Sequence, residues 1–358
     1  MTLRSTKILT TLVAMTAVAC SGGADPDPTT TDTTTSSTAL TTTTTTAAPD
    51  STTTAPPLEQ IVLDLPGEMS DAWTEILTLP YGDPPEHLGT SPGGDGEGIM
   101  WGPDYGVQMP DETWWFLDAA NLRFAHYSET GDYLGDRALP PEHLASGSYF
   151  QLQRPQALSD GTFVAVSTNP SSAGLLRMET DGSLNGVPMP EWISYSIGDG
   201  TYLYGFSEGS PVQVDPGTGA VTSVTDFRGQ SGDPFSIFLD PGQIRIIRPG
   251  VDLNLPIYSA LDPGETVYPA VEAAMGSDGT LFVFLTGIVE RSPGDAYDVI
   301  GFFSVSRTGV ASPVEHVRSP FTEADGGGGP RLGVRFGDNH PYLMFIDTDA
   351  VRVFRRDG

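Results

Sequence analysis

Short runs of apolar and β-branched residues, each opened by a tight-turn signal, recur along the chain after residue 58. The turn signals fall at 110–113, 159–162, 198–201, 240–243, 277–280 and 337–339. The runs after them are rich in aromatic and β-branched side chains, which favour strands: TWWFLD, TFVAVST, TYLYGFS, QIRIIRP, TLFVFLT and PYLMFID. None of this region has the apolar period of an amphipathic helix. The pattern predicts an all-β domain.

A second series of turns follows the first, in most cases roughly twenty residues later, near the half-period of a propeller blade. These turns fall at 129–131, 180–182, 215–217, 262–264, 307–309 and 356–358. Each unit therefore reads as four strands joined by a tight turn, a loop and a second tight turn. The units repeat at intervals of about 37–60 residues, in or near the range of propeller blades. We predict a six-bladed β-propeller of four-stranded antiparallel blades over residues 58–358.

The last unit lacks a fourth strand, because the chain ends at Arg356-Asp357-Gly358, where a turn should lead into one. Two apolar runs near the start of the domain can supply it, residues 61–65 and residues 73–79. Pairing either run with residues 351–355 closes the ring and removes exposed strand edges. We expect the run from Trp73 to do so, because it directly precedes the first complete blade.

Residues 77–140 resemble the NHL-type β-propeller repeat. The residues that carry the resemblance are Gly102-Pro103, Gly131 and the run Asp118-x-x-Asn121-x-Arg123. The other five units keep the rhythm of turns and strands but lack the Asn-x-Arg. The resemblance implies a propeller that binds proteins or other ligands, although a few related six-bladed propellers are enzymes.

The N-terminus reads as an export signal. Arg4 and Lys7 precede an apolar segment, residues 8–18, that is too short to span a bilayer. Ala17-Val18-Ala19-Cys20 follows, and Cys20 is the only cysteine in the chain, so no internal disulfide can form. This arrangement resembles a bacterial lipoprotein lipobox, which predicts a signal peptide at 1–19, a lipidated Cys20 and anchoring at the extracytoplasmic face of the cell membrane. Ala-Val-Ala also suits the ordinary signal peptidase, so a freely secreted protein is the alternative.

Composition limits the partners of the chain. After Cys20, residues up to 57 are Thr-rich and contain Leu40 as their one large apolar residue, which predicts a disordered linker. The formal net charge is −29, and removal of Arg4 and Lys7 with the signal leaves −31. Such a field opposes binding to nucleic acid and to anionic headgroups. We expect a monomer with a solubilising acidic surface.

The sequence contains no recognisable catalytic motif. It lacks Gly-x-Ser-x-Gly, and its five histidines show no pairing at metal-ligand spacing. We therefore predict no catalytic residue, no bound metal and no cofactor. An enzyme remains the alternative, because propellers that resemble the senescence-marker and gluconolactonase group hold a divalent cation on the axis. Asp104 and Glu272 are the candidate carboxylates for such a site.

Candidate ligand-binding residues come from aromatic side chains and long loops. Trp114 and Trp115 must face opposite sides of one strand, so one of them packs between blades and the other could stack on a ligand. Residues 287–298, with Glu290 and Arg291, and residues 248–256, which begin at Arg248, read as long loops between second and third strands. We take Trp114, Arg248, Glu290 and Arg291 as candidates. Packing residues and variable surface loops are the alternative interpretation.

Two hypotheses follow. The first is a lipid-anchored propeller that binds a protein, peptide or glycan at the cell envelope. The second is an extracytoplasmic lactonase or lyase with an axial divalent cation. At least three carboxylate or amide side chains converging on the channel mouth would favour the enzyme. A channel lined by apolar and small residues would favour binding.

Overall fold

A computed structural model describes residues 58–65, 67–92, 100–101, 103, 105–140, 155–166, 174–191, 193–261, 264–292, 295–317, 331–347 and 349–357. The chain divides into two units at Pro56 and Pro57, and the described residues all belong to the second unit. The predicted signal peptide, Cys20 and the linker lie outside the described residues. Among the described residues, no helix is long and apolar enough to cross a bilayer.

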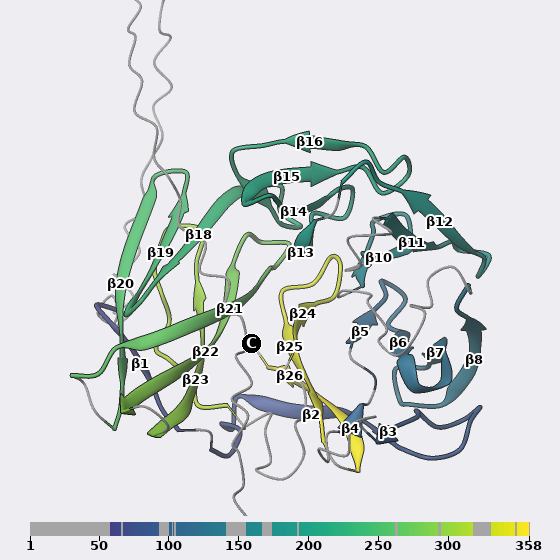
Figure 1. Cartoon of the computed structure of the whole chain (residues 1–358), viewed down its shortest axis with the longest axis horizontal. Coiled ribbons are helices and arrows are strands. Elements are labelled where there is room, and N and C mark those ends of the chain that lie inside the picture. Colours follow the sequence, from purple (N-terminus) through teal and green to yellow (C-terminus); the bar gives the residue numbers. More distant parts are fainter. Residues whose placement is uncertain are drawn as a thin grey trace, which may run out of the picture. The chain divides into compact units, whose positions relative to one another are not determined.

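The fold is a six-bladed β-propeller of antiparallel sheets, as predicted. The blades follow one another around the domain in chain order (Figure 1). The first blade contains β5 (Tyr105–Gln108), β6 (Trp114–Asp118), β7 (Arg123–Tyr127) and β8 (Tyr133–Ala138). The second contains β9 (Gln156–Ala157), β10 (Phe163–Val166), β11 (Gly174–Met178) and β12 (Leu184–Pro188). The third contains β13 (Ser194–Gly198), β14 (Leu203–Ser207), β15 (Ser210–Val214) and β16 (Val221–Ser223).

The later blades vary this plan. Blade four contains β17 (Phe227–Arg228), β18 (Pro234–Asp240), β19 (Gln243–Arg248) and β20 (Val251–Ser259). Blade five contains β21 (Val267–Met275), β22 (Leu281–Ser292) and β23 (Asp295–Val305), and residues 311–315 bond to β23 as its fourth edge. Blade six contains β24 (Arg331–Val334), β25 (Pro341–Ile346), β26 (Ala350–Arg356) and β2 (Trp73–Pro80). Outside the blades lie β3 (Ser91–Pro92), β4 (Met100–Trp101) and the 3-10 helix η1 (Ala119–Asn121).

Ring closure follows the expectation for the Trp73 run. Strand β2 pairs antiparallel with β26, from Trp73 opposite Arg356 to Pro80 opposite Ala350. The other candidate run forms β1 (Ile61–Leu63), which pairs in parallel with β20 on the outer edge of blade four. Both N-terminal runs are therefore used, one to close the ring and one to extend a blade.

The sequence interpretation of blade four was wrong by one strand. The turn at 240–243 joins β18 to β19, the second and third strands, and the first turn of this blade is 229–233. Residues 248–256 are not a long loop, because Pro249 and Gly250 form a tight turn that leads directly into β20. The turn predicted at 262–264 consequently falls in the connection to blade five. The first strand of the blade spans two residues, too few to show any alternation of apolar and polar positions.

Residues 287–292 and 295–298 are not a loop either. They belong to β22 and β23, in which Val289 pairs with Tyr297 and Ile288 with Asp298. These are the second and third strands of blade five, as expected. The charged residues of this segment suggested a loop. The β-branched residues Ile288 and Val289 favour a strand, and their pairing with β23 extends both strands through the segment.

The core consists of apolar layers between neighbouring blades. Trp114, Phe116 and Tyr342 belong to the layer between blades six and one, whereas Trp115, Phe124 and Phe163 belong to the layer between blades one and two. Adjacent residues of one strand point to opposite faces, so each central strand serves two layers. The side chains of consecutive blades therefore fasten each sheet to the next.

Candidate functional site

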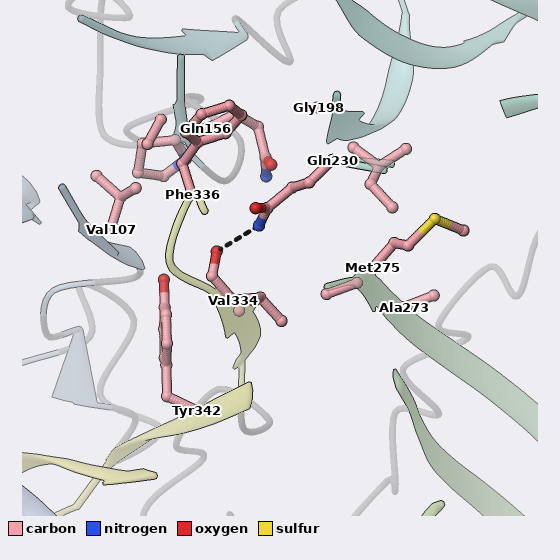
Figure 2. Close-up of a pocket in the computed structure, with 14 residues that line it drawn as sticks. Val107, Gln156, Gly198, Gln230, Ala273, Met275, Val334, Phe336 and Tyr342 are labelled. Carbon is pink, nitrogen blue, oxygen red and sulfur yellow. Dashed lines mark hydrogen bonds between the residues drawn. The ribbon is translucent and has the colours of Figure 1, made fainter. Parts of the chain in front are cut away.

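The innermost strands of the blades surround an axial pocket. Figure 2 shows residues from several blades converging on it, among them Val107 of blade one, Gln156 of blade two and Met275 of blade five. Small residues line much of the wall: Ala157, Gly198, Ala273, Ala274 and Gly333. Six strands that converge on one axis leave little room for side chains, so small residues are expected there. Gly333 illustrates this, because an added Cβ would lie 2.2 Å from Cζ of Tyr342.

Gln230 connects two blades that are not neighbours. It follows β17 in blade four, and its Nε2 donates to the carbonyl oxygens of Arg335 (3.0 Å) and Val334 (3.4 Å) in blade six. Its Oε1 accepts a hydrogen bond from the amide of Gly337 at 2.6 Å. The direction of this side chain, from blade four to the strand end in blade six, is visible in Figure 2. Both ends of the amide are thus used to hold residues 334–337 in place.

Phe336 extends from the same turn toward blade three. A Cβ added to Gly200 would lie 2.0 Å from Cε2 of Phe336, so the ring rests directly against the Gly200 backbone. Gly200 also has φ +87°, a conformation in which a larger residue would be strained. Phe336 lines the axial pocket beside Gln156 (Figure 2). The part of the pocket next to blades two and three is therefore bounded by an aromatic ring that comes from blade six.

Polar contacts hold the remainder of the turn at 335–340. Arg335 pairs with Glu112 of blade one and, at 3.1 Å, with Asp338. Its hydrogen bond lowers the pKa of Glu112. In blade five, the amide of Ser277 donates to Asp338 O at 3.0 Å, and the amide of Asp278 donates to Asn339 Oδ1 at 2.8 Å. One turn of blade six thus contacts blades one, three, four and five.

The pocket wall carries amides and a phenol but no carboxylate among the described residues. Glu272 of β21 does not line it: its Oε2 accepts from the amide of Leu332 (2.7 Å), and its Oε1 lies 3.4 Å from Nη1 of Arg331. The Arg331 guanidinium in turn lies 4.6 Å from the ring centroid of Tyr105. Asp104 lies outside the described residues. Within the described ranges, no three His, Cys, Asp or Glu side chains are grouped to hold a metal ion.

The four candidate ligand residues do not form one site: Trp114 lies in blade one, Arg248 in blade four, and Glu290 and Arg291 in blade five. Trp114 is completely buried, with Tyr342 edge-on at 5.0 Å, so neither ring face is open to a ligand. Arg248 is buried and donates to the carbonyl oxygens of Gly279 (2.6 Å), Ser306 (3.2 Å) and Val305 (3.3 Å), which joins blade four to blade five. Burial lowers its pKa. Glu290 and Arg291 lie in β22, and their side chains fall outside the described part of the structure.

Sequence reasoning did not identify Gln156, Gln230 or Phe336. Gln230 and Phe336 belong to the first turns of blades four and six, and Gln156 to the short innermost strand of blade two. A propeller places these segments around the axis, so the repeat itself indicated the region. The individual residues gave no signal, because an isolated Gln or Phe in a turn is compatible with many environments.

Comparison with known proteins gives a family and a set of similar folds. The family described as "Domain of unknown function (DUF7485)" matches residues 71–356. No curated protein matches the sequence. Among solved structures, virginiamycin B lyase from Staphylococcus aureus is 9% identical with a TM-score of 0.42, over 79% of this chain and 98% of its own. Aldose sugar dehydrogenase from Streptomyces coelicolor is 11% identical with a TM-score of 0.43, over 79% and 97% of the two chains. At such identities these names say nothing about the ligands of this chain.

Proposed function

The chain belongs to the family described as Domain of unknown function (DUF7485), and we propose that it is an exported, lipid-anchored, NHL-like propeller that binds a ligand outside the membrane. The ligand class is a protein, peptide or glycan. The binding site is the axial pocket around Gln156, Gln230 and Phe336.

One observation supports binding over axial-cation catalysis. Small and apolar residues, two glutamines and aromatic rings form the described pocket wall, and Glu272 is engaged by Leu332 and Arg331 outside it. Apolar and aromatic side chains recognise apolar and ring-bearing groups of a ligand through burial and stacking. A reaction through an axial cation would need several oxygen ligands directed at one point.

The proposed location depends on the N-terminal sequence. Arg4, Lys7 and the apolar segment before Cys20 suit export, and the small residues before Cys20 suit lipidation. A single lipid chain gives marginal membrane affinity, so stable anchoring would need a second attachment signal besides one acyl chain. The acidic surface opposes other attachment to anionic lipids.

A capture experiment tests the site. Immobilised residues 58–358 are incubated with native envelope extract, and the captured molecule is identified and titrated in purified form. Replacing Phe336 with Ala and Gln156 with Ala together should weaken its binding by about 1–3 kcal/mol, because two side chains of the pocket wall, one of them aromatic, are lost. Phe238→Ala is the matched control, since Phe238 is a 40% exposed phenylalanine of β18, away from the pocket. Equal affinity of both variants would place the ligand elsewhere on the propeller.

A further inference from the structure

Strand β1 is attached to the propeller differently from the other outer strands. Ile61, Val62 and Leu63 pair in parallel with Ile257, Tyr258 and Ser259 of β20, the last strand of blade four. Neighbouring strands within the blades pair antiparallel. The residues that match the family begin at 71, after β1. Blade four is thus complete without β1, which lies on it as a fifth strand.

The outer edge of blade four buries two side chains of β1. Ile61 and Leu63 are fully buried in the core layer that includes Leu255, Ile257 and Phe303, whereas Val62 between them is 38% exposed. Gly301 of β23 leaves space for both Val314 and Leu63, because an added Cβ would lie 2.7 Å from Val314 Cγ1 and 2.8 Å from Leu63 Cδ2. Gly301 is not in the left-handed region of φ, so its backbone does not require glycine.

Backbone groups at the junction of blades four and five complete this site. The amide of Ala260 donates to Leu63 O at 2.8 Å, and the amide of Ile300 donates to Asp64 O at 2.9 Å. Among the described residues, β20 pairs with β1 at Ile257 to Ser259.

We propose that this edge is a strand-binding site, and that β1 is a segment of the same chain that occupies it. Its partner is an extended protein segment with large apolar residues at alternate positions, which runs parallel to β20 and displaces β1. Main-chain hydrogen bonds give such a segment its affinity, and the sites of Ile61 and Leu63 give it specificity. The choice of a protein partner rests on the proposed binding function, although this site is separate from the axial pocket.

Peptide binding to the full chain tests the proposal. The probe is a fluorescent peptide with the sequence of residues 58–65. An Ile61→Ser, Leu63→Ser variant should bind it at least about tenfold more tightly than the unaltered chain, because its cis strand no longer competes. Adding Gly301→Ala should reverse this gain, since the new Cβ lies 2.8 Å from the position of Leu63 Cδ2. Because the same Cβ lies 2.7 Å from Val314 Cγ1, circular dichroism of this variant must match that of the unaltered chain for the comparison to count. A peptide with Ser at both apolar positions is the control. Equal affinity of the variant and the unaltered chain, or of the two peptides, overturns the proposal.

Hydrogen exchange on the unaltered chain provides a test that does not depend on variants. If β1 detaches independently, the amides of Ala260 and Ile300 should exchange at least about tenfold faster than that of Ile257, whose partner is Gly242 O within the described domain. Equal rates would make β1 an integral strand and overturn the proposal. Phe336→Ala should leave peptide binding unchanged, so that failure at the pocket and failure at this edge are distinguishable.

Discussion

At the residue scale, the Asp118-x-x-Asn121-x-Arg123 run forms a buried polar cluster. Asp118 Oδ2 accepts from Arg123 Nε and from Asn121 Nδ2, both at 2.9 Å. The guanidinium also donates to Pro85 O (2.8 Å) and His87 O (2.6 Å). The run that carried the NHL resemblance therefore holds the segment before blade one against that blade.

Replacing Arg123 with Ala should lower the free energy of unfolding by about 3–5 kcal/mol, because Asp118 is left buried without its cation. Arg137→Ala is the control: Arg137 is exposed and donates to Gly182 O, so its loss should cost under about 1 kcal/mol. Urea unfolding of the two variants measures both values. Similar small losses would mean that the cluster is not stabilising.

His126 predicts a dependence of stability on pH. Its ring stacks on Trp115 with centroids 4.1 Å apart and planes at 3°, and its Nε2 is buried without a partner in the described structure. Burial lowers the pKa of His126. The unfolded chain therefore binds the proton more readily, with a pKa near the ordinary value of about 6.5. The stability that neutral His126 contributes is fully present at a pH above the pKa of the unfolded chain. It is lost as the pH falls toward the lower pKa of His126 in the folded protein.

His126→Phe should remove this acid-side loss, because phenylalanine keeps the stack but does not titrate. The measurement compares the fall in unfolding free energy between neutral and mildly acidic pH in the variant and in the unaltered chain. The fall should be smaller in the variant. An identical fall in both proteins would show that His126 does not contribute to it.

At the element scale, β2 closes the ring with more than its strand pairing. Trp73 Nε1 donates to Glu315 Oε2 at 3.1 Å, and Arg356 Nη2 pairs with Glu315 Oε1 at 2.7 Å. Glu315 lies on the outer edge of blade five, bonded to Phe302. The closing strand and the last strand are therefore both joined to the neighbouring blade.

A chain that starts at Tyr81 should be insoluble or aggregate, because loss of β2 exposes the edge of β26 and removes several kcal/mol of pairing and burial. A chain that starts at Leu58 should fold. One that starts at Asp71 keeps β2 and should also fold, although it loses about 3–6 kcal/mol from the burial of Ile61 and Leu63. Soluble yield and circular dichroism decide this. Equal behaviour of the Tyr81 and Leu58 chains would contradict ring closure as a source of stability.

At the scale of the whole molecule, the prediction concerns Cys20. Replacing it with Ser should release the protein from membranes, because the lipid on Cys20 is the proposed attachment of this acidic chain. Membrane fractionation and incorporation of labelled fatty acid measure the effect, with Ser21→Ala as the control. A Cys20→Ser variant that stays with membranes and takes up fatty acid would refute the anchor.

The sequence by itself determined the fold class and the closure of the ring. Alternation at Trp114 and Trp115 set the faces of a strand, and the unpaired run at Val351 required a partner from the other end of the domain. These inferences succeeded because the two-residue period and the turn chemistry are local properties. The strand assignment in blade four failed because this local signal was missing there: the two residues of β17 are too few to show a period.

Only the tertiary structure decided the candidate sites. Arg248 has the charge of a binding residue, but its guanidinium is used by carbonyl groups of the next blade. Gln230 and Phe336 reach the axial pocket through contacts with blades distant in the chain. Whether a polar or aromatic side chain is free for a ligand depends on which other groups fold against it. Such long-range contacts leave no periodic trace in the sequence.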